Sequence, residues 1–259
     1  EDGIRAQPRS RGRGDVYKRQ CSTEIMGNKL VDAKRLLELS AGLGALTLVT
    51  TYLVSTTSGR VAPFIPIISE MPFAEPESSL FSAGLTVSIF CFILLAQTFH
   101  RIFGPIAREA GGNYESWNDL IRIMASFGGV CGIITVNFHW NIHPVLHGVT
   151  AGVLFTSFLI WGTFANHLLE KSGRGDNTRR LAIYLGWGFF LFMIIFSALD
   201  SQKLVEDGHG FFYRLDNPPT VDQDRSTYLN LTALCEWGMV FSFYIAAFTY
   251  RKELEGTSI

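Results

Sequence analysis

The stretch SGRVAPFIPIISEMPFAEPESSLF, residues 58–81, separates two long apolar runs and holds four of the nine prolines in the chain. Proline fixes φ and lacks a backbone donor, so Pro63, Pro66, Pro72 and Pro76 exclude a helix or a central strand here. The apolar residues between the prolines are too numerous for a solvated linker. The sequence therefore predicts a rigid, partly buried, non-helical loop between two membrane spans.

The chain on both sides of this loop is apolar: 47% of its residues are hydrophobic and 17% are charged. Soluble proteins carry about 25% charged residues. The apolar residues form six runs, each long enough to cross a bilayer core of roughly 30 Å as about 20 helical residues. None alternates as a strand does, which favours a helical bundle over a barrel. The predicted spans are 38–57, 80–99, 120–140, 148–169, 181–199 and 228–250.

The predicted fold is therefore an all-α integral membrane protein, with six transmembrane helices in one bundle. The distribution of basic residues orients it. With the amino terminus in the cytosol, the cytosolic segments after residue 20 hold twelve basic residues and the opposite segments hold four. The positive-inside rule then places both termini in the cytosol. The acidic 58–79 and 200–227 loops are expected on the luminal or outer side.

Residues 1–25 are expected to be a disordered tail or a non-native leader, because residues 1–20 have almost no apolar content. Residues 26–259 are predicted to form a single six-helix transmembrane domain, since no segment outside the spans is long enough for another folded domain.

Glu236 is the sharpest anomaly in the predicted spans, because it lies near the middle of the sixth. A bare carboxylate is costly at that depth, so it must face the bundle interior and find partners, or take up a proton. One hypothesis is a structural cluster of hydrogen bonds, and the other is a proton, ion or lipid-headgroup site. The polar side chains expected at similar depth on other spans are Thr47, Ser88, Thr156 and Ser157.

His139, His143 and His147 are spaced by four, which on one helix would align them on one face. Pro144 argues against one continuous helix through all three, so we expect interfacial histidines and no metal site. His147 and Asn137 are expected to form a polar pair at the luminal mouth of the third and fourth spans.

No nucleophile elbow, phosphate loop, zinc-helix motif or dinucleotide fingerprint is present in the sequence. We therefore expect no catalytic residue and no cofactor. Small residues predict close helix contacts at Gly128 and Gly132 of the third span, and at Gly148 and Gly152 of the fourth.

With this topology, the proline-rich loop resembles the first luminal loop of the damage-regulated autophagy modulator (DRAM) family. The residues that carry the resemblance are Gly59, Pro63, Phe64, Pro66, Ile68, Ser69, Pro76, Glu77 and Ser78. Two further landmarks agree with it. Asn137-Phe138 and His147 resemble the turn between that family's third and fourth spans, and Cys235-Glu236-Trp237 resembles its sixth-span motif. The chain departs from the family in the charged segment where Glu75 precedes Pro76.

The resemblance implies a lysosomal or endosomal membrane protein that promotes autophagy, is linked to apoptosis and has no established catalytic residues. The wider group also includes proteins of GPI-lipid remodelling and a tether of a phosphoinositide kinase. We therefore expect a non-enzymatic regulator that acts on membrane lipids or membrane proteins and not on nucleic acid. A lipid-remodelling enzyme or subunit and a small proton-coupled transporter are the alternatives, with the ER, Golgi or plasma membrane as other locations.

Overall fold

The computed structural model describes residues 32–210, 213–217 and 225–257. Within them, six long helices are apolar enough to cross a membrane, and the described residues contain no sheet. The long helices are α2 (Ala33–Thr57), α3 (Glu77–Ala110), α4 (Tyr114–Asn137), α5 (Pro144–Lys171), α6 (Asn177–Glu206) and α8 (Thr227–Thr249). The short ones are η1 (Ile68–Glu70), α7 (Tyr213–Asp216) and η2 (Tyr250–Lys252). The prediction of an all-α, six-helix membrane bundle is confirmed.

The helix limits follow from local chemistry. Asp32, Asp176 and Ser226 cap the first turns of α2, α6 and α8, where each side chain accepts a hydrogen bond from a backbone N–H that has no partner in the helix. Pro144 occupies the first position of α5, where a missing N–H costs nothing. Gly111 ends α3 at a φ of 71°, a conformation that favours glycine. Helix α4 ends at Asn137, a little before the end of the predicted third span.

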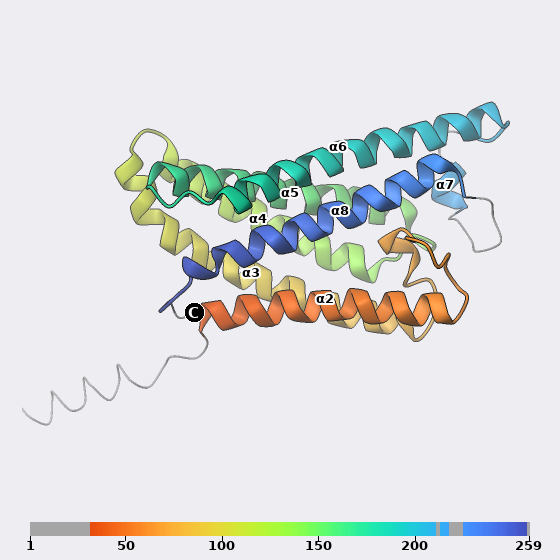
Figure 1. The fold of residues 1–259 in the computed structure, drawn as a ribbon, viewed down its shortest axis with the longest axis horizontal. Helices are drawn as coiled ribbons and strands as arrows, with labels where there is room; N and C mark the ends of the chain where they lie inside the picture. The colour runs from red at the N-terminus through yellow and green to blue at the C-terminus, as the bar shows by residue number, and fades with distance from the viewer. Residues whose placement is uncertain (1–31, 211–212, 218–224, 258–259) are drawn as a thin grey trace, which may run out of the picture.

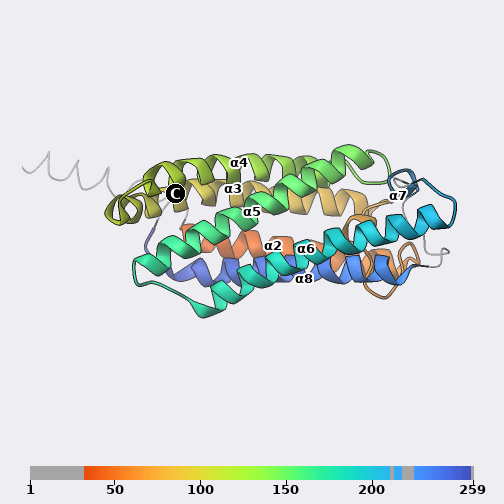
Figure 2. The same ribbon diagram turned by 90° about the horizontal axis from the view of Figure 1, so that it is seen from above.

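The six helices run along one axis, and consecutive helices from α2 to α5 pack side by side (Figure 1). Helices α6 and α8 form the most closely packed pair, which contacts the rest of the bundle through α2 and α5. In Figure 2, α4 and α8 lie along opposite edges of the view and α5 crosses diagonally between them. The outward residues are largely apolar, among them Leu46, Phe127 and Phe241, as lipid contact requires.

Both ends of the described chain lie at one end of the bundle, here called the termini end (Figure 1). The Ala33 backbone N–H donates to the carbonyl of Thr257 over 3.0 Å, and Lys34 pairs with Glu255 at 2.8 Å. The opposite end, here called the loop end, holds residues 58–76 and 138–143. The predicted tail of residues 1–25 lies outside the described residues.

Small residues bring α4 and α5 together, as predicted for Gly128 and Gly132. A Cβ atom at Gly128 would lie 2.5 Å from the Cβ of Ser157, and one at Gly132 would lie 2.8 Å from a methyl carbon of Leu154. The matching prediction for Gly148 and Gly152 is wrong, because nothing lies within 4 Å of either Cβ position. The close contact is one-sided: the glycines of α4 receive the side chains of α5.

Candidate functional site: a clasped loop at one end of the bundle

Residues 58–76, here called the proline loop, fold into the loop end of the bundle. Pro66, Pro72 and Met71 are buried, and the chain makes one turn of 3₁₀ helix at Ile68–Glu70. The ends of the loop, Pro63 and Phe64 are exposed, and 72% of the surface of Phe64 is accessible. The loop therefore lies among the helix ends and closes this end of the bundle.

Helix α8 holds the middle of the proline loop with two consecutive side chains. Glu236 is 7% exposed, and its Oε2 accepts a hydrogen bond from the Ile68 backbone N–H over 2.6 Å. The indole N–H of Trp237 donates to the Pro66 carbonyl over 2.8 Å. Glu236 is the tenth residue of α8, so the loop extends into the bundle past the first turns of this helix. The sequence predicted partners for Glu236 on other spans, but the partner found is loop backbone.

Helix α5 contributes His147, which is buried between α4 and the loop. Its Nδ1 lies 3.0 Å from the carbonyl oxygens of both Thr135 and Phe138, so Nδ1 carries the proton. In the neutral ring Nε2 then accepts from the Ser69 hydroxyl, 2.8 Å away. The predicted pair of His147 with Asn137 is wrong. Asn137 donates to Thr86 Oγ1 and to its own helix, because it lies on the exposed side of α4.

A buried ion pair holds the same segment. Glu70 is 2% exposed, and its Oε2 accepts from Arg225 over 2.8 Å and from the Ile67 backbone N–H over 3.1 Å. Arg225 also donates to the Asn230 side chain over 3.0 Å. In the sequence alone, Glu70 is one of several loop acids that are expected to be solvated. Its burial could not be predicted, because it depends on where the chain near Arg225 folds back.

Two side chains of helix α2 bind the proline loop, one on each side of the 3₁₀ turn. The Tyr52 hydroxyl donates to the Pro63 carbonyl over 2.8 Å, and the Ser55 hydroxyl donates to the Met71 carbonyl over 2.9 Å. Six side chains bind the middle of the proline loop, from Pro63 to Met71, and are here called the clasp. They are Tyr52, Ser55, His147, Arg225, Glu236 and Trp237.

The remaining residues of the predicted loop signature have structural positions at its two ends. Gly59 leaves α2 at a φ of 67°. Pro76 is the N-cap residue of α3 and Ser78 lies in its first turn, where its N–H donates to the Ala74 carbonyl over 2.8 Å. Glu77 is fully buried and forms an ion pair with Arg60. These contacts fix where the loop starts and stops.

Burial makes the Glu70 ion pair sensitive to pH. Desolvation raises the pKa of Glu70 above its usual 4.5, and the Arg225 guanidinium offsets this only in part. The folded protein therefore binds this proton more tightly than the unfolded chain does. The contribution of Glu70 to stability must then grow as the pH falls through the raised pKa towards 4.5.

We therefore expect acidification to favour the native protein over Glu70→Gln, whose amide keeps the Arg225 contact and does not titrate. The difference in thermal unfolding midpoint, native minus Glu70→Gln, should increase between pH 7 and pH 4.5. Purified protein in detergent allows the measurement. A difference that is constant or shrinks over this range contradicts the assignment.

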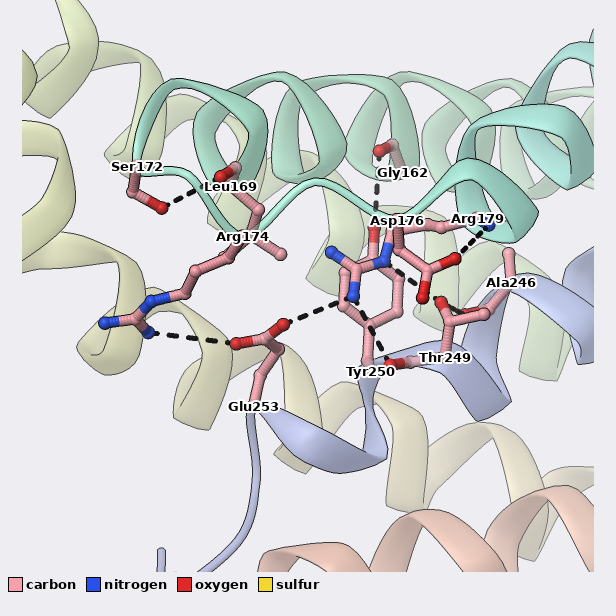
Figure 3. Close-up of polar contacts among 10 residues, drawn as sticks. All are labelled: Gly162, Leu169, Ser172, Arg174, Asp176, Arg179, Ala246, Thr249, Tyr250 and Glu253. Atoms are coloured by element: carbon pink, nitrogen blue, oxygen red, sulfur yellow. Dashed lines mark hydrogen bonds and ion pairs between the residues drawn. The ribbon is translucent and has the colours of Figure 1, made fainter.

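The termini end contains a second buried polar cluster, which Figure 3 shows. Arg179 is 1% exposed, and its guanidinium lies 4.3 Å from the centre of the Tyr250 ring. It donates from Nε to Thr249 Oγ1 over 3.0 Å and pairs with Glu253 at 3.2 Å. The sequence identified Arg179 only as one cytosolic positive charge among twelve. The contacts of Arg179 with Thr249, Tyr250 and Glu253 join the start of α6 to the end of α8.

In the described part of the chain, no three His, Cys, Asp or Glu side chains are grouped so as to hold a metal ion. His139 illustrates this, because its Nε2 lies 3.0 Å from Ser82 Oγ and 3.2 Å from the Val136 carbonyl. The chemistry of the loop end is thus that of hydrogen bonds and buried carboxylates, among them Glu70, Glu77 and Glu236.

Six apolar helices, closed at one end by a largely buried loop, define a multi-pass integral membrane protein. Residues 35–257 match the sequence model of the Frag1/DRAM/Sfk1/Cwh43P N-terminal domain, and the chain belongs to this family. DNA damage-regulated autophagy modulator protein 1 of Xenopus laevis is 26% identical over 217 residues, covering 81% of this chain and 85% of that protein. The Homo sapiens protein of the same name is 24% identical over 220 residues, covering 82% and 86%. No solved structure is significantly similar to this chain.

Proposed function

We propose that this protein is a non-enzymatic membrane regulator of autophagy, located in lysosomes or endosomes, that acts on lipid or protein partners through its loop end. The similarity to autophagy modulator proteins supports this proposal, because it extends over more than four fifths of the chain. The observation that carries it is the clasp. The loop and the helix motifs that resemble the DRAM family meet at one place, where Glu236 and Trp237 bind Ile68 and Pro66.

The proposed orientation places the termini end in the cytosol and the loop end in the lumen. Lys34, Arg174, Arg180 and Arg251 lie at the termini end, which agrees with the positive-inside rule. The proline loop then faces the acidic lumen of the organelle. A rigid loop of fixed shape is suited to recognise a partner there, because little conformational entropy is lost on binding.

Rescue of autophagic flux tests the proposal. Cells that lack the protein would receive the native chain or Glu236→Gln, and turnover of autophagosomes would be compared with and without an inhibitor of lysosomal acidification. The side-chain amide oxygen in Glu236→Gln can still accept from the Ile68 N–H. This variant is therefore expected to fold, to reach lysosomes and to retain at least half of the native flux.

Two outcomes contradict the proposal. If the native chain does not restore flux at all, its role in autophagy is wrong. If Glu236→Gln is folded and correctly located yet inactive, Glu236 acts by titration, and a catalytic or proton-coupled role replaces the regulatory one. Staining of a tagged chain that lacks residues 1–20 tests the location, and ER or Golgi staining contradicts the lysosomal address.

A further inference from the structure

A cavity of about 220 Å³ lies inside the helix bundle, between the clasped loop and the cluster of aromatic residues at the termini end. Residues of all six long helices, α2, α3, α4, α5, α6 and α8, form its wall, and the Ile68–Ser69 segment of the proline loop closes one end. Apolar cavities of about 150 Å³ in proteins stay dry and take up apolar guests. This cavity is large enough for part of an aliphatic chain.

The cavity is elongated along the bundle. Glu236 and Tyr250 both line it and are 14 residues apart (250 minus 236), which corresponds to about 21 Å at 1.5 Å per residue of helix. This is about two thirds of a bilayer core of roughly 30 Å. At the termini end it is closed by Tyr250, whose ring packs against Phe99 and Trp161 with centroids 5.3 Å away in both cases. A long narrow shape fits part of one extended hydrocarbon chain.

The wall offers a side entrance from the membrane. The backbones of α5 and α8 approach each other at few points, and aromatic side chains bridge the space between them. Phe243 of α8 lies 6.1 Å from Phe155 and 6.2 Å from Phe158, measured between ring centroids. All three rings line the cavity and are partly exposed. Rotation of these side chains would admit a chain directly from the lipid.

The charged group of the lining lies towards the loop end and is acidic. Among the described residues that line the cavity, Glu236 is the one with an acidic side chain, and none is Lys or Arg. Arg225, which is bound to Glu70 of the proline loop, does not line the cavity. His147 also lines the cavity, but its Nε2 is bound to Ser69 and its Nδ1 to backbone carbonyls. A negatively charged ligand would therefore meet a carboxylate with no compensating cation.

Glu236 itself has capacity for a further hydrogen bond. In the described part of the chain its one donor is the Ile68 N–H, which binds Oε2. A carboxylate accepts several hydrogen bonds, and those from a cation are the strongest. A buried carboxylate with a single neutral donor at the end of an apolar channel is suited to an aliphatic ammonium group.

We propose that this cavity binds one hydrocarbon chain of an amine-bearing lipid, with the ammonium group against Glu236 and the chain extending towards Tyr250. The proline loop then forms the lid over the polar end of the ligand. This binding goes beyond the proposed role in autophagy and does not depend on it, because it can be measured with the purified protein alone.

Photo-crosslinking of the purified full chain in detergent tests the proposal. The probe is octadecylamine with a diazirine in mid-chain and a terminal alkyne, and the comparator is octadecanoic acid with the same two groups. The amine probe is expected to label peptides of α5 and α8, and unlabelled octadecylamine should compete with it. Labelling by the acid should be about tenfold weaker, since it lacks the ion pair with Glu236.

Two variants locate the site. Ala151→Phe adds bulk inside the cavity and is expected to reduce amine labelling at least about fivefold, because overfilled apolar sites cannot relax freely. Ala198→Phe on the exposed face of α6 is its matched control and should label like the native chain. Glu236→Gln should reduce amine labelling about tenfold and leave acid labelling unchanged or higher.

Equal labelling by the acid and the amine overturns the proposed headgroup. Labelling confined to peptides outside the cavity overturns the site, as does unchanged labelling of a folded Ala151→Phe variant. If Ala151→Phe does not fold, the acid comparator and Glu236→Gln decide the question, since neither adds bulk to the bundle. A failure of the amine probe to label the protein would not change the result of the autophagic-flux rescue. The lipid site and the proposed role in autophagy can therefore be contradicted independently.

Discussion

Replacement of Arg179 by alanine is expected to lower the free energy of unfolding by about 3–5 kcal/mol, the range measured when one partner of a buried ion pair is removed. Arg179 is buried, pairs with Glu253 at 3.2 Å and stacks on the Tyr250 ring. Among the described residues, its loss leaves Glu253, which is mostly buried, with the longer 3.8 Å contact to Arg174. Titration of the purified protein with a denaturing detergent would measure the loss.

The adjacent Arg180 provides a matched control for this prediction. Its side chain is about half exposed, donates to Asn177 over 2.9 Å and lies 3.8 Å from Glu170. Exposed ion pairs contribute about 0–1 kcal/mol, so Arg180→Ala should change stability by no more than that. Both variants remove one positive charge from the same end of α6. Any effect of that charge on membrane orientation should therefore be equal in the two. Similar losses in the two would show that Arg179 contributes through charge and not through burial.

Replacement of Gly128 by leucine is expected to disrupt the packing of α4 on α5, at a cost of about 1–3 kcal/mol or more. The first atom of any side chain there would lie 2.5 Å from the Ser157 Cβ and 3.7 Å from the Val153 carbonyl oxygen. Because helices in a membrane associate through close packing and not through exclusion of water, the lost approach has no compensation. The same detergent titration would show an earlier unfolding midpoint.

Gly152→Leu is the control, because Gly152 lies in a helix of the same bundle with open space around its Cβ position. It should stay within about 1 kcal/mol of the native chain, the range of helix propensity for such an exchange. An equal destabilisation by both variants would contradict the close contact between α4 and α5.

The sequence allowed prediction of the features that depend on local composition. Each long helix contains an apolar run, and the prolines of the loop excluded helix where the structure has only a single 3₁₀ turn. The motifs of the candidate site were also recognised, including Glu236 and His147. The length of an apolar run and the fixed φ of a proline are properties of about twenty consecutive residues, the length of one span. They can therefore be recognised without knowing which helices are neighbours.

The partners of those residues could not be predicted in this way. Glu236 binds loop backbone and Asn137 binds Thr86, because helix rotation and packing decide which face of each helix is inside. Arg179 and Glu70 have the sequence surroundings of solvated charges, yet both are buried among segments distant in the chain. The two glycine pairs have the same spacing and differ only in whether a neighbouring helix lies opposite them.

The clasp has a consequence for the order in which the protein is made. The hydrogen bond between Ile68 and Glu236 joins residues 168 positions apart, and the Trp237–Pro66 bond spans 171. During synthesis the loop is made before α8, and it cannot form these two hydrogen bonds until α8 has entered the bilayer. Until then the Ile68 N–H and the Pro66 carbonyl lack these partners. We therefore expect chains that stop before α8 to be recognised as unfinished and degraded, so that only complete copies leave the compartment in which they are synthesised.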